Sequence, residues 1–195
     1  SMQEPFIDLD INSKSQLSLM EIAREVCPEV VIVYTSTRQI YGKPQYLPVD
    51  EEHPIRPVDV NGVNKLAGEQ FHLLYFDVYG LKTVCLRLTN TYGPCMRIKD
   101  ARQTFLGVWV RNLILGKPIL VFGDGEQTRD FNYVEDVVNA LILASKSEKC
   151  FGKTINLGSS EVISLEELAK KLCDMHQGGS YELVPFPPER KAIDI

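Results

Sequence analysis

The chain has 195 residues, of which 44% are apolar and 24% are charged, the composition of an ordinary globular protein. Its mild net charge of −5 argues against a nucleic-acid-binding protein, which would carry a basic stripe. No apolar run reaches the length of a membrane-spanning helix, and we find no charged-then-apolar secretory leader, so we expect no membrane partner.

The five cysteines are scattered along the chain without a C-x-x-C pair. This odd count and wide spacing indicate reduced thiols in a cytoplasmic protein rather than a disulfide framework or a zinc site. The histidines, His53, His72 and His176, are too dispersed in the sequence for a metal cluster. We therefore expect a cytoplasmic location and no bound metal.

Apolar patterning predicts helices that alternate with short buried strands along the chain. The expected helices cover residues 12–26, 59–78, 101–115, 135–146 and 164–176. The expected strands cover residues 30–36, 83–88, 119–122, 130–134, 154–157 and 181–185. This alternation indicates an α/β fold with a largely parallel sheet, because continuous apolar strands suit a sheet that is covered on both faces.

Several residues mark the expected helix ends. Asn12 or Ser13 is expected to cap the first helix, and Gly80 is a suitable residue to end the second. Ser164 followed three residues later by Glu167 has the spacing of a capping box at the start of the last helix.

Short motifs follow one another in a distinctive order: VYTSTRQIYG, NGVNK, LRLTNTYGP, GKPILVFGDGEQTRDFNYVEDV, INLGSS and PPER. With these motifs, residues 9 to 190 resemble the extended short-chain dehydrogenases that act on nucleotide sugars, such as UDP-galactose 4-epimerase and the sugar-nucleotide dehydratases. The resemblance implies a truncated Rossmann-type parallel sheet with helices on both faces, together with a small α/β substrate-binding cap.

The resemblance also implies a division of the chain. Residues 1–95 would be the C-terminal part of an NAD-binding domain. Residues 96–195 would mainly form the nucleotide-sugar-binding cap, with residues 130–160 returning to the core sheet.

The catalytic positions implied by the resemblance are Thr37, Asn61 and Lys65. Thr37 follows the strand over residues 30–36, where the family places a hydroxyl that hydrogen-bonds the reacting sugar. Without the other motifs, Thr35, Ser36 and Thr37 would be interpreted as turn residues that bond local backbone. Lys65 matches the lysine of the family's Y-x-x-x-K motif, which lowers the pKa of the tyrosine.

The tyrosine of that motif is replaced by Asn61. An amide does not titrate near neutral pH and cannot act as the base, although it can hydrogen-bond a sugar or a water. Tyr34, Tyr41 and Tyr92 lie in or near the matching motifs, and a base supplied by another side chain stays open.

The resemblance implies NAD as cofactor, with contacts from Asn12, Thr35, Lys65 and Leu88. The family holds the pyrophosphate with a G-x-x-G-x-x-G turn at a helix N-terminus, and this sequence has no such turn. We therefore expect NAD to bind the full-length parent protein and to bind this chain weakly or not at all.

The implied partner is a nucleoside diphosphate sugar. In the family pattern, separate residues contact its base, its diphosphate and its sugar. These residues are Asn90, Phe105, Leu120, Phe122, Arg129 and Arg190. Arginine suits a diphosphate because its planar donors meet two phosphate oxygens at once. The alternatives are a turn-former at Asn90, a core residue at Phe105 and exposed ion pairs at both arginines.

The beginning of the chain is unusual for the resemblance. Ser1-Met2 is typical of a residue left by tag cleavage before a start codon, and the strand over residues 30–36 would lack neighbours on one side. We expect either a shortened or proteolysed form of a longer chain, or a homodimer or other self-association that covers the bare edge.

Two functional hypotheses follow. In the first, the parent protein is an NAD-dependent nucleotide-diphospho-sugar epimerase or dehydratase, and this chain is a fragment of it. In the second, the chain is a non-catalytic nucleotide-sugar-binding or assembly module, with Asn61 as the mark of lost redox chemistry.

Overall fold

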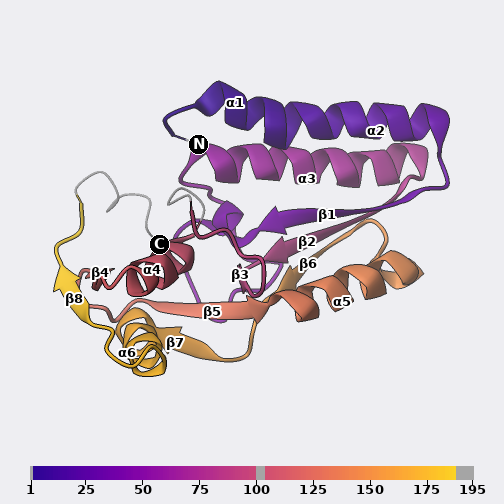
Figure 1. The fold of residues 1–195 in the computed structure, drawn as a ribbon. Coiled ribbons are helices and arrows are strands. Elements are labelled where there is room, and N and C mark those ends of the chain that lie inside the picture. Colours follow the sequence, from indigo (N-terminus) through magenta and orange to yellow (C-terminus); the bar gives the residue numbers. More distant parts are fainter. Residues whose placement is uncertain (1, 100–103, 188–195) are drawn as a thin grey trace. The chain divides into compact units, whose positions relative to one another are not determined.

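The computed structural model describes residues 2–99 and 104–187, which form an alternating series of helices and strands (Figure 1). The chain divides into two compact units, residues 1–89 with 135–158 and residues 90–134 with 159–194. The predicted α/β class is confirmed, and each unit is described by itself below.

The first unit is built on a parallel sheet in the order β1 (Val31–Thr37), β2 (Lys82–Leu88) and β6 (Lys153–Leu157). Thr37 lies opposite Leu88, and Leu88 lies opposite Leu157. The carboxyl ends of all these strands therefore meet at one edge of the sheet, where open α/β sheets bind their ligands.

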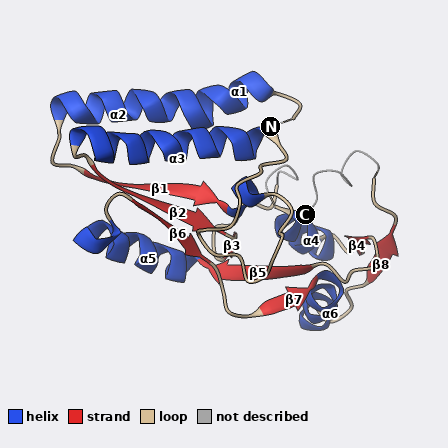
Figure 2. Cartoon of the chain, turned by 180° about the vertical axis from the view of Figure 1, so that it is seen from behind, coloured by secondary structure: helices blue, strands red, loops and turns tan. Residues whose placement is uncertain are grey.

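Helices cover both faces of this sheet, as Figures 1 and 2 show from opposite sides. Helices α1 (Pro5–Leu9) and α2 (Ser15–Val26) pack with α3 (Val60–Tyr79) on one face, and α5 (Val134–Lys146) covers the other. The core on the first face contains the buried residues Met20, Ala23, Tyr75 and Leu81. The core on the second face contains the buried residues Val84, Leu86 and Ala144.

The first helix begins earlier than the sequence predicted. Pro5 starts α1 at a first-turn position, where its missing N–H is no loss, and a π-helical turn over Asp10–Lys14 links α1 to α2 without a break. Asn12 and Ser13 therefore lie inside the helix, and the prediction that one of them caps it is wrong. The Gly80 cap is confirmed, since Gly80 is left-handed with φ of 72°.

The second unit contains two small sheets. In one, β5 (Thr128–Tyr133) pairs in parallel with β3 (Asn90–Tyr92) and antiparallel with β7 (Val162–Ser164). In the other, β4 (Ile119–Phe122) runs parallel to β8 (Tyr181–Val184).

Helices α4 (Phe105–Ile114) and α6 (Leu165–Met175) pack on β4 of the second unit. The expected helix over residues 101–115 contains α4, while its residues 101–103 lie outside the described residues. Ser164 caps α6 as predicted, because its hydroxyl accepts a hydrogen bond from the Glu167 N–H at 3.1 Å. The buried core comprises Trp109, Leu113, Ile119, Val121, Leu165, Ala169 and Cys173.

Two short 3-10 helices complete the described chain, η2 (Arg38–Tyr41) directly after β1 and η3 (Glu148–Cys150) before β6. Among the described residues, no helix combines the length and apolarity needed to cross a membrane.

Candidate functional site

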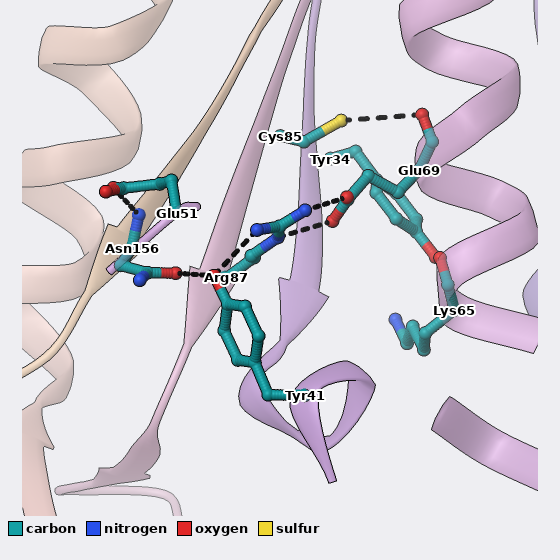
Figure 3. Close-up of polar contacts among 8 residues, drawn as sticks. All are labelled: Tyr34, Tyr41, Glu51, Lys65, Glu69, Cys85, Arg87 and Asn156. Carbon is teal, nitrogen blue, oxygen red and sulfur yellow. Dashed lines mark hydrogen bonds and ion pairs between the residues drawn. The ribbon is translucent and has the colours of Figure 1, made fainter. Parts of the chain in front are cut away.

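Lys65 and Thr35 meet in the first unit, at the end of the sheet where the strand carboxyl ends lie. The Lys65 ammonium donates a hydrogen bond to the Thr35 carbonyl oxygen at 3.0 Å and lies 5.0 Å from the centre of the Tyr34 ring. Figure 3 shows Lys65 reaching from α3 beside Tyr34. Burial lowers the pKa of Lys65, and the negative charge of Asp8 partly opposes this shift. The lysine is thus a fixed, half-buried cation.

Thr37 lies at the last position of β1, where its hydroxyl oxygen accepts a hydrogen bond from the Gln39 N–H at 3.2 Å. The hydroxyl proton is still available for donation to a ligand. The first turn of α3 packs against this segment, since a Cβ added to Gly62 would lie 3.1 Å from the Gln39 carbonyl oxygen. The neighbouring Ser36 hydroxyl is buried and has no hydrogen-bond partner among the described residues.

Asn61 lies one helical turn before Lys65, so both side chains share one side of α3. Its amide nitrogen donates to an oxygen of Asp8 at 3.2 Å. Asn64 donates to the other Asp8 oxygen at 2.9 Å. Asn12 also hydrogen-bonds Asp8, so three asparagines surround one carboxylate.

Asp8 belongs to this candidate site, and the sequence did not reveal it. Burial works to raise its pKa, but the hydrogen bonds from Asn64, Asn61 and Asn12 outweigh burial and hold the pKa below its ordinary value. Asp8 and Asn61 are 53 residues apart, and no local pattern links them. Only the packing of α1 against α3 brings them together.

Two tyrosines near the matching motifs are unsuited to act as the base. Tyr34 is buried, donates to the Lys65 carbonyl oxygen at 3.3 Å and has a pKa raised by that burial. The Tyr41 hydroxyl is held between Arg87 at 2.6 Å and Asn156 at 2.7 Å, and burial raises its pKa despite Arg87. Both tyrosines stay protonated near neutral pH.

A buried polar network fixes the elements around this site (Figure 3). Glu69 on α3 forms an ion pair with Arg87 on β2. Arg87 also donates a hydrogen bond to the hydroxyl of Tyr41 in η2. Tyr41 in turn donates to Asn156 on β6. The network therefore connects the middle of α3 with β2, β6 and η2, the segment that directly follows β1.

The predicted cofactor positions fall into two groups. Thr35 and Lys65 are in direct contact, and Leu88 lies on β2 opposite Thr37 in the sheet register. Asn12 lies instead in the π-helical turn, where it hydrogen-bonds Asp8.

In the second unit, two predicted substrate residues have polar contacts of their own. The Asn90 amide donates to the Asp130 carbonyl oxygen at 3.0 Å. Arg129 on β5 donates to the Thr128 carbonyl oxygen at 2.9 Å. Arg190 lies outside the described residues.

The remaining substrate positions of the second unit are apolar. Phe105 is half-buried at the start of α4, with its ring edge-on to Trp109 at 5.0 Å. Leu120 is 39% exposed, and its carbonyl oxygen accepts from the Trp109 indole at 3.1 Å. Phe122 lies 6.0 Å from the Phe186 ring, centre to centre.

Comparison with known proteins shows that the chain is similar to nucleotide-sugar epimerases. The chain is 33% identical to a putative UDP-glucose 4-epimerase of Methanocaldococcus jannaschii over 168 residues, which are 86% of this chain and 54% of that protein. The chain thus spans about half the length of this curated relative.

Solved structures show the same similarity. A UDP-glucose 4-epimerase of Thermotoga maritima, solved with UDP-glucose, matches 98% of this chain and 61% of its own, with a TM-score of 0.87 and 28% identity. A UDP-glucuronic acid 4-epimerase of Bacillus cereus, solved with UDP-glucuronic acid and NAD, matches 89% of this chain and 54% of its own, with a TM-score of 0.78 and 27% identity.

The family model described as the NAD dependent epimerase/dehydratase family matches residues 1–158, most of the chain. The order of motifs, the parallel sheet with its Rossmann-type relatives and the match of this model agree. The chain therefore belongs to the NAD-dependent epimerase/dehydratase family.

Proposed function

We propose that this chain carries the reacting and substrate-holding side chains of an NAD-dependent nucleotide-diphospho-sugar epimerase or dehydratase. The observation that carries the proposal is the contact of Lys65 with Thr35 at the carboxyl end of β1, one helical turn from Asn61 and on the strand that ends in Thr37. Relatives named as UDP-glucose and UDP-glucuronic acid epimerases support this substrate class.

The residues present fit the nicotinamide end of NAD. Lys65 uses one of its three ammonium protons on the Thr35 carbonyl and has others for ribose hydroxyls, and Thr35 is exposed beside it. When bound, NAD would supply the redox chemistry of the family. The sequence holds no G-x-x-G-x-x-G turn for the pyrophosphate, so we expect this chain alone to bind NAD weakly.

The chain's own residues would act on the sugar in fixed roles. The Thr37 hydroxyl donates to an oxygen at the reacting carbon, and the Lys65 cation stabilises negative charge that develops there. Asn61 holds the same group by a hydrogen bond but takes no proton, because an amide does not titrate near neutral pH. We propose that Arg129 binds the diphosphate, and that Leu120 and Phe122 contact the base.

Ligand-induced thermal stabilisation tests the proposal. We expect UDP-sugars to raise the melting temperature of the chain and NAD to raise it little. Arg129→Ala should abolish the shift, whereas Arg24→Ala, which breaks surface ion pairs with Glu21 and Glu25 and a cation–π contact with Tyr79, should retain it. No stabilisation by any member of a panel of UDP-, GDP-, CDP- and dTDP-sugars would sink the binding proposal.

The alternative, a non-catalytic nucleotide-sugar-binding module, is not favoured by the relatives described above, which carry the names of enzymes. Asn61 is the residue that decides between the two. If the full-length protein turns over a nucleotide sugar with NAD while it carries Asn61, the non-catalytic alternative fails. If only the Asn61→Tyr variant is active, the enzyme proposal fails for the natural sequence.

We also propose that the protein forms a homodimer. The outer edge of β1 pairs with no other strand among the described residues. The helices of the first unit also expose apolar side chains, with Phe6 79%, Ile22 59% and Val78 60% exposed. Such surfaces favour association. Size-exclusion chromatography with light scattering should show a dimer, and a stable monomer would contradict the proposal.

A cytoplasmic location is the last part of the proposal. It is supported by the cysteines, all five of which are unpaired. Proteins exposed to an oxidising compartment tend to carry disulfides. Fractionation of the source cells should place the protein with cytoplasmic markers, and its recovery from a secreted fraction would contradict this location.

A further inference from the structure

The hydrogen bond to Asp8 determines which end of the Asn61 amide faces that carboxylate. Asp8 accepts from Asn61 through one carboxylate oxygen and from Asn64 through the other, at 3.2 and 2.9 Å. An ionised carboxylate can only accept hydrogen bonds. The NH2 group of Asn61, and not its carbonyl oxygen, must therefore face Asp8.

Asp8 is itself a poor candidate for the missing base. Its three asparagine donors stabilise the anion and hold its pKa below the ordinary value, against the opposing effect of burial. Proton transfer is most effective when the pKa of the base lies near the working pH. The carboxylate therefore serves better as a permanent acceptor than as a group that takes and returns a proton.

With its NH2 group engaged by Asp8, Asn61 has its carbonyl oxygen left for a ligand. Within the described part of the chain, no group donates a hydrogen bond to this oxygen, and the side chain is only half-buried. Asn61 shares a helix face with Lys65, and the next residue, Gly62, packs against the segment that follows Thr37. The free oxygen thus belongs to the same part of the first unit as the proposed reacting groups.

We propose that Asp8 is a positioning residue that turns the tyrosine position of this site into an acceptor-only contact, which takes a hydrogen bond from a sugar hydroxyl. The inference rests on the proposed function. A hydroxyl donates to the Asn61 oxygen and can still accept from Thr37, whereas a ketone has no proton to donate. The substrate class is therefore a nucleotide sugar that carries a hydroxyl at the reacting carbon when it binds.

The first experiment tests the Asp8–Asn61 contact without cofactor or substrate. Side-chain amide resonances of the full-length protein are recorded by two-dimensional ¹H–¹⁵N NMR and assigned with Asn61→Ala and Asn64→Ala. In Asp8→Ala, both pairs should move toward the values of exposed asparagines. Asp10→Ala, which removes only the exposed partner of Lys14, should move neither.

Two further results complete this experiment. Asp8→Asn leaves one carbonyl acceptor for three asparagine amides, so at least one resonance pair should shift even if Asp8→Ala fails to fold. An unchanged Asn61 resonance pair in a folded Asp8 variant overturns the proposal.

The second experiment tests the selection of a hydroxyl. Because the relatives are named as 4-epimerases, carbon 4 is the position to vary. The full-length protein should bind UDP-glucose about 3- to 10-fold more tightly than UDP-4-deoxy-4-fluoro-glucose, whose fluorine cannot donate, as expected for one lost hydrogen bond. Asp8→Ala should reduce this difference to less than about 2-fold, since the freed amide can turn.

The outcomes separate the two proposals. Equal binding of both sugars by the wild-type protein overturns the acceptor-only contact. Binding of neither sugar counts against the proposed substrate class, and the NMR result then decides alone whether Asp8 orients Asn61.

Discussion

Arg87 donates hydrogen bonds to both carboxylate oxygens of Glu69, with nitrogen–oxygen distances of 3.1 and 2.5 Å. The Arg87 side chain is 4% exposed and that of Glu69 is 0% exposed, so neither charge can return to water if its partner is removed. We expect Glu69→Ala to lower the free energy of unfolding by about 3–5 kcal/mol, because a buried charge is left without a partner. Denaturant unfolding measures this loss.

Two controls define the Glu69 prediction. Replacing both partners, as in Glu69→Leu with Arg87→Met, should cost less than Glu69→Ala alone, because no unpaired charge is left in the core. Lys82→Ala breaks only the exposed pair with Glu29 and should leave stability unchanged within error. A Glu69→Ala variant as stable as Lys82→Ala would contradict the structure.

His72 should make folding sensitive to mild acid. The ring is fully buried, stacks on Tyr34 at 4.7 Å and has a pKa lowered to about 4 by burial. The unfolded chain binds a proton near pH 6.5, whereas the folded chain does so only near pH 4. The contribution of His72 to the free energy of unfolding is therefore fully present above about pH 6.5. It falls by about 3 kcal/mol in all as the pH drops toward 4.

Unfolding free energies of the wild type and His72→Gln, measured between pH 4 and 7, check this dependence. In His72→Gln, the free energy of unfolding should depend less steeply on pH than in the wild type. His176→Gln, at an exposed position, should keep the dependence of the wild type. Equal slopes for the wild type and His72→Gln would show that His72 does not titrate as expected.

Gly68 should not tolerate even one additional methyl group. A Cβ there would lie 2.6 Å from the Tyr34 hydroxyl oxygen and 2.8 Å from the Asn12 carbonyl oxygen. We expect Gly68→Ala to lower the free energy of unfolding by about 1–3 kcal/mol, although alanine favours a helix by about 1 kcal/mol. Gln70→Ala, exposed on the same helix, should change stability by less than about 0.5 kcal/mol. A stabilised Gly68→Ala would show that α3 packs less closely against Tyr34 and the π-helical turn.

Lys65→Met should reduce turnover by the full-length protein about 100-fold or more, since the cation at the Thr35 carbonyl is lost while the apolar stem is retained. Steady-state kinetics with a nucleotide sugar give kcat/KM, and NAD titration should show weaker binding. Lys14→Met, which removes an exposed cation of the π-helical turn, is the matched control. Equal kcat/KM for both variants would remove Lys65 from the proposed site.

Much of the fold was predictable because the signals were local. Gly80 supplies the left-handed residue that ends α3, and Ser164 supplies the side chain that caps α6. The three-residue strands β3 and β7 were missed, because so few residues show no periodicity. The start of α1 was missed although Pro5 marked it, since proline favours the first turn of a helix.

The site was predictable only in part. The resemblance to a known family predicted Thr37 and Lys65 as site residues, and helical spacing placed Asn61 on the same side of α3 as Lys65. The contact of Lys65 with the Thr35 backbone, and the carboxylate of Asp8, come from packing between segments far apart in the sequence. No pattern within a single segment reports such contacts.

The π-helical turn over Asp10–Lys14 has a consequence for how this site can change. A π-helical turn holds about one residue more than a turn of an α-helix, in which each residue advances the chain by about 100°. Deleting one residue there would convert the wide turn into an ordinary α-helical turn, so the turn that carries Asp8 would keep its orientation about the axis of α2. Asp8 would still face Asn61. This turn is thus the place where the helix can lose one residue while the chemical groups that the protein distinguishes stay the same.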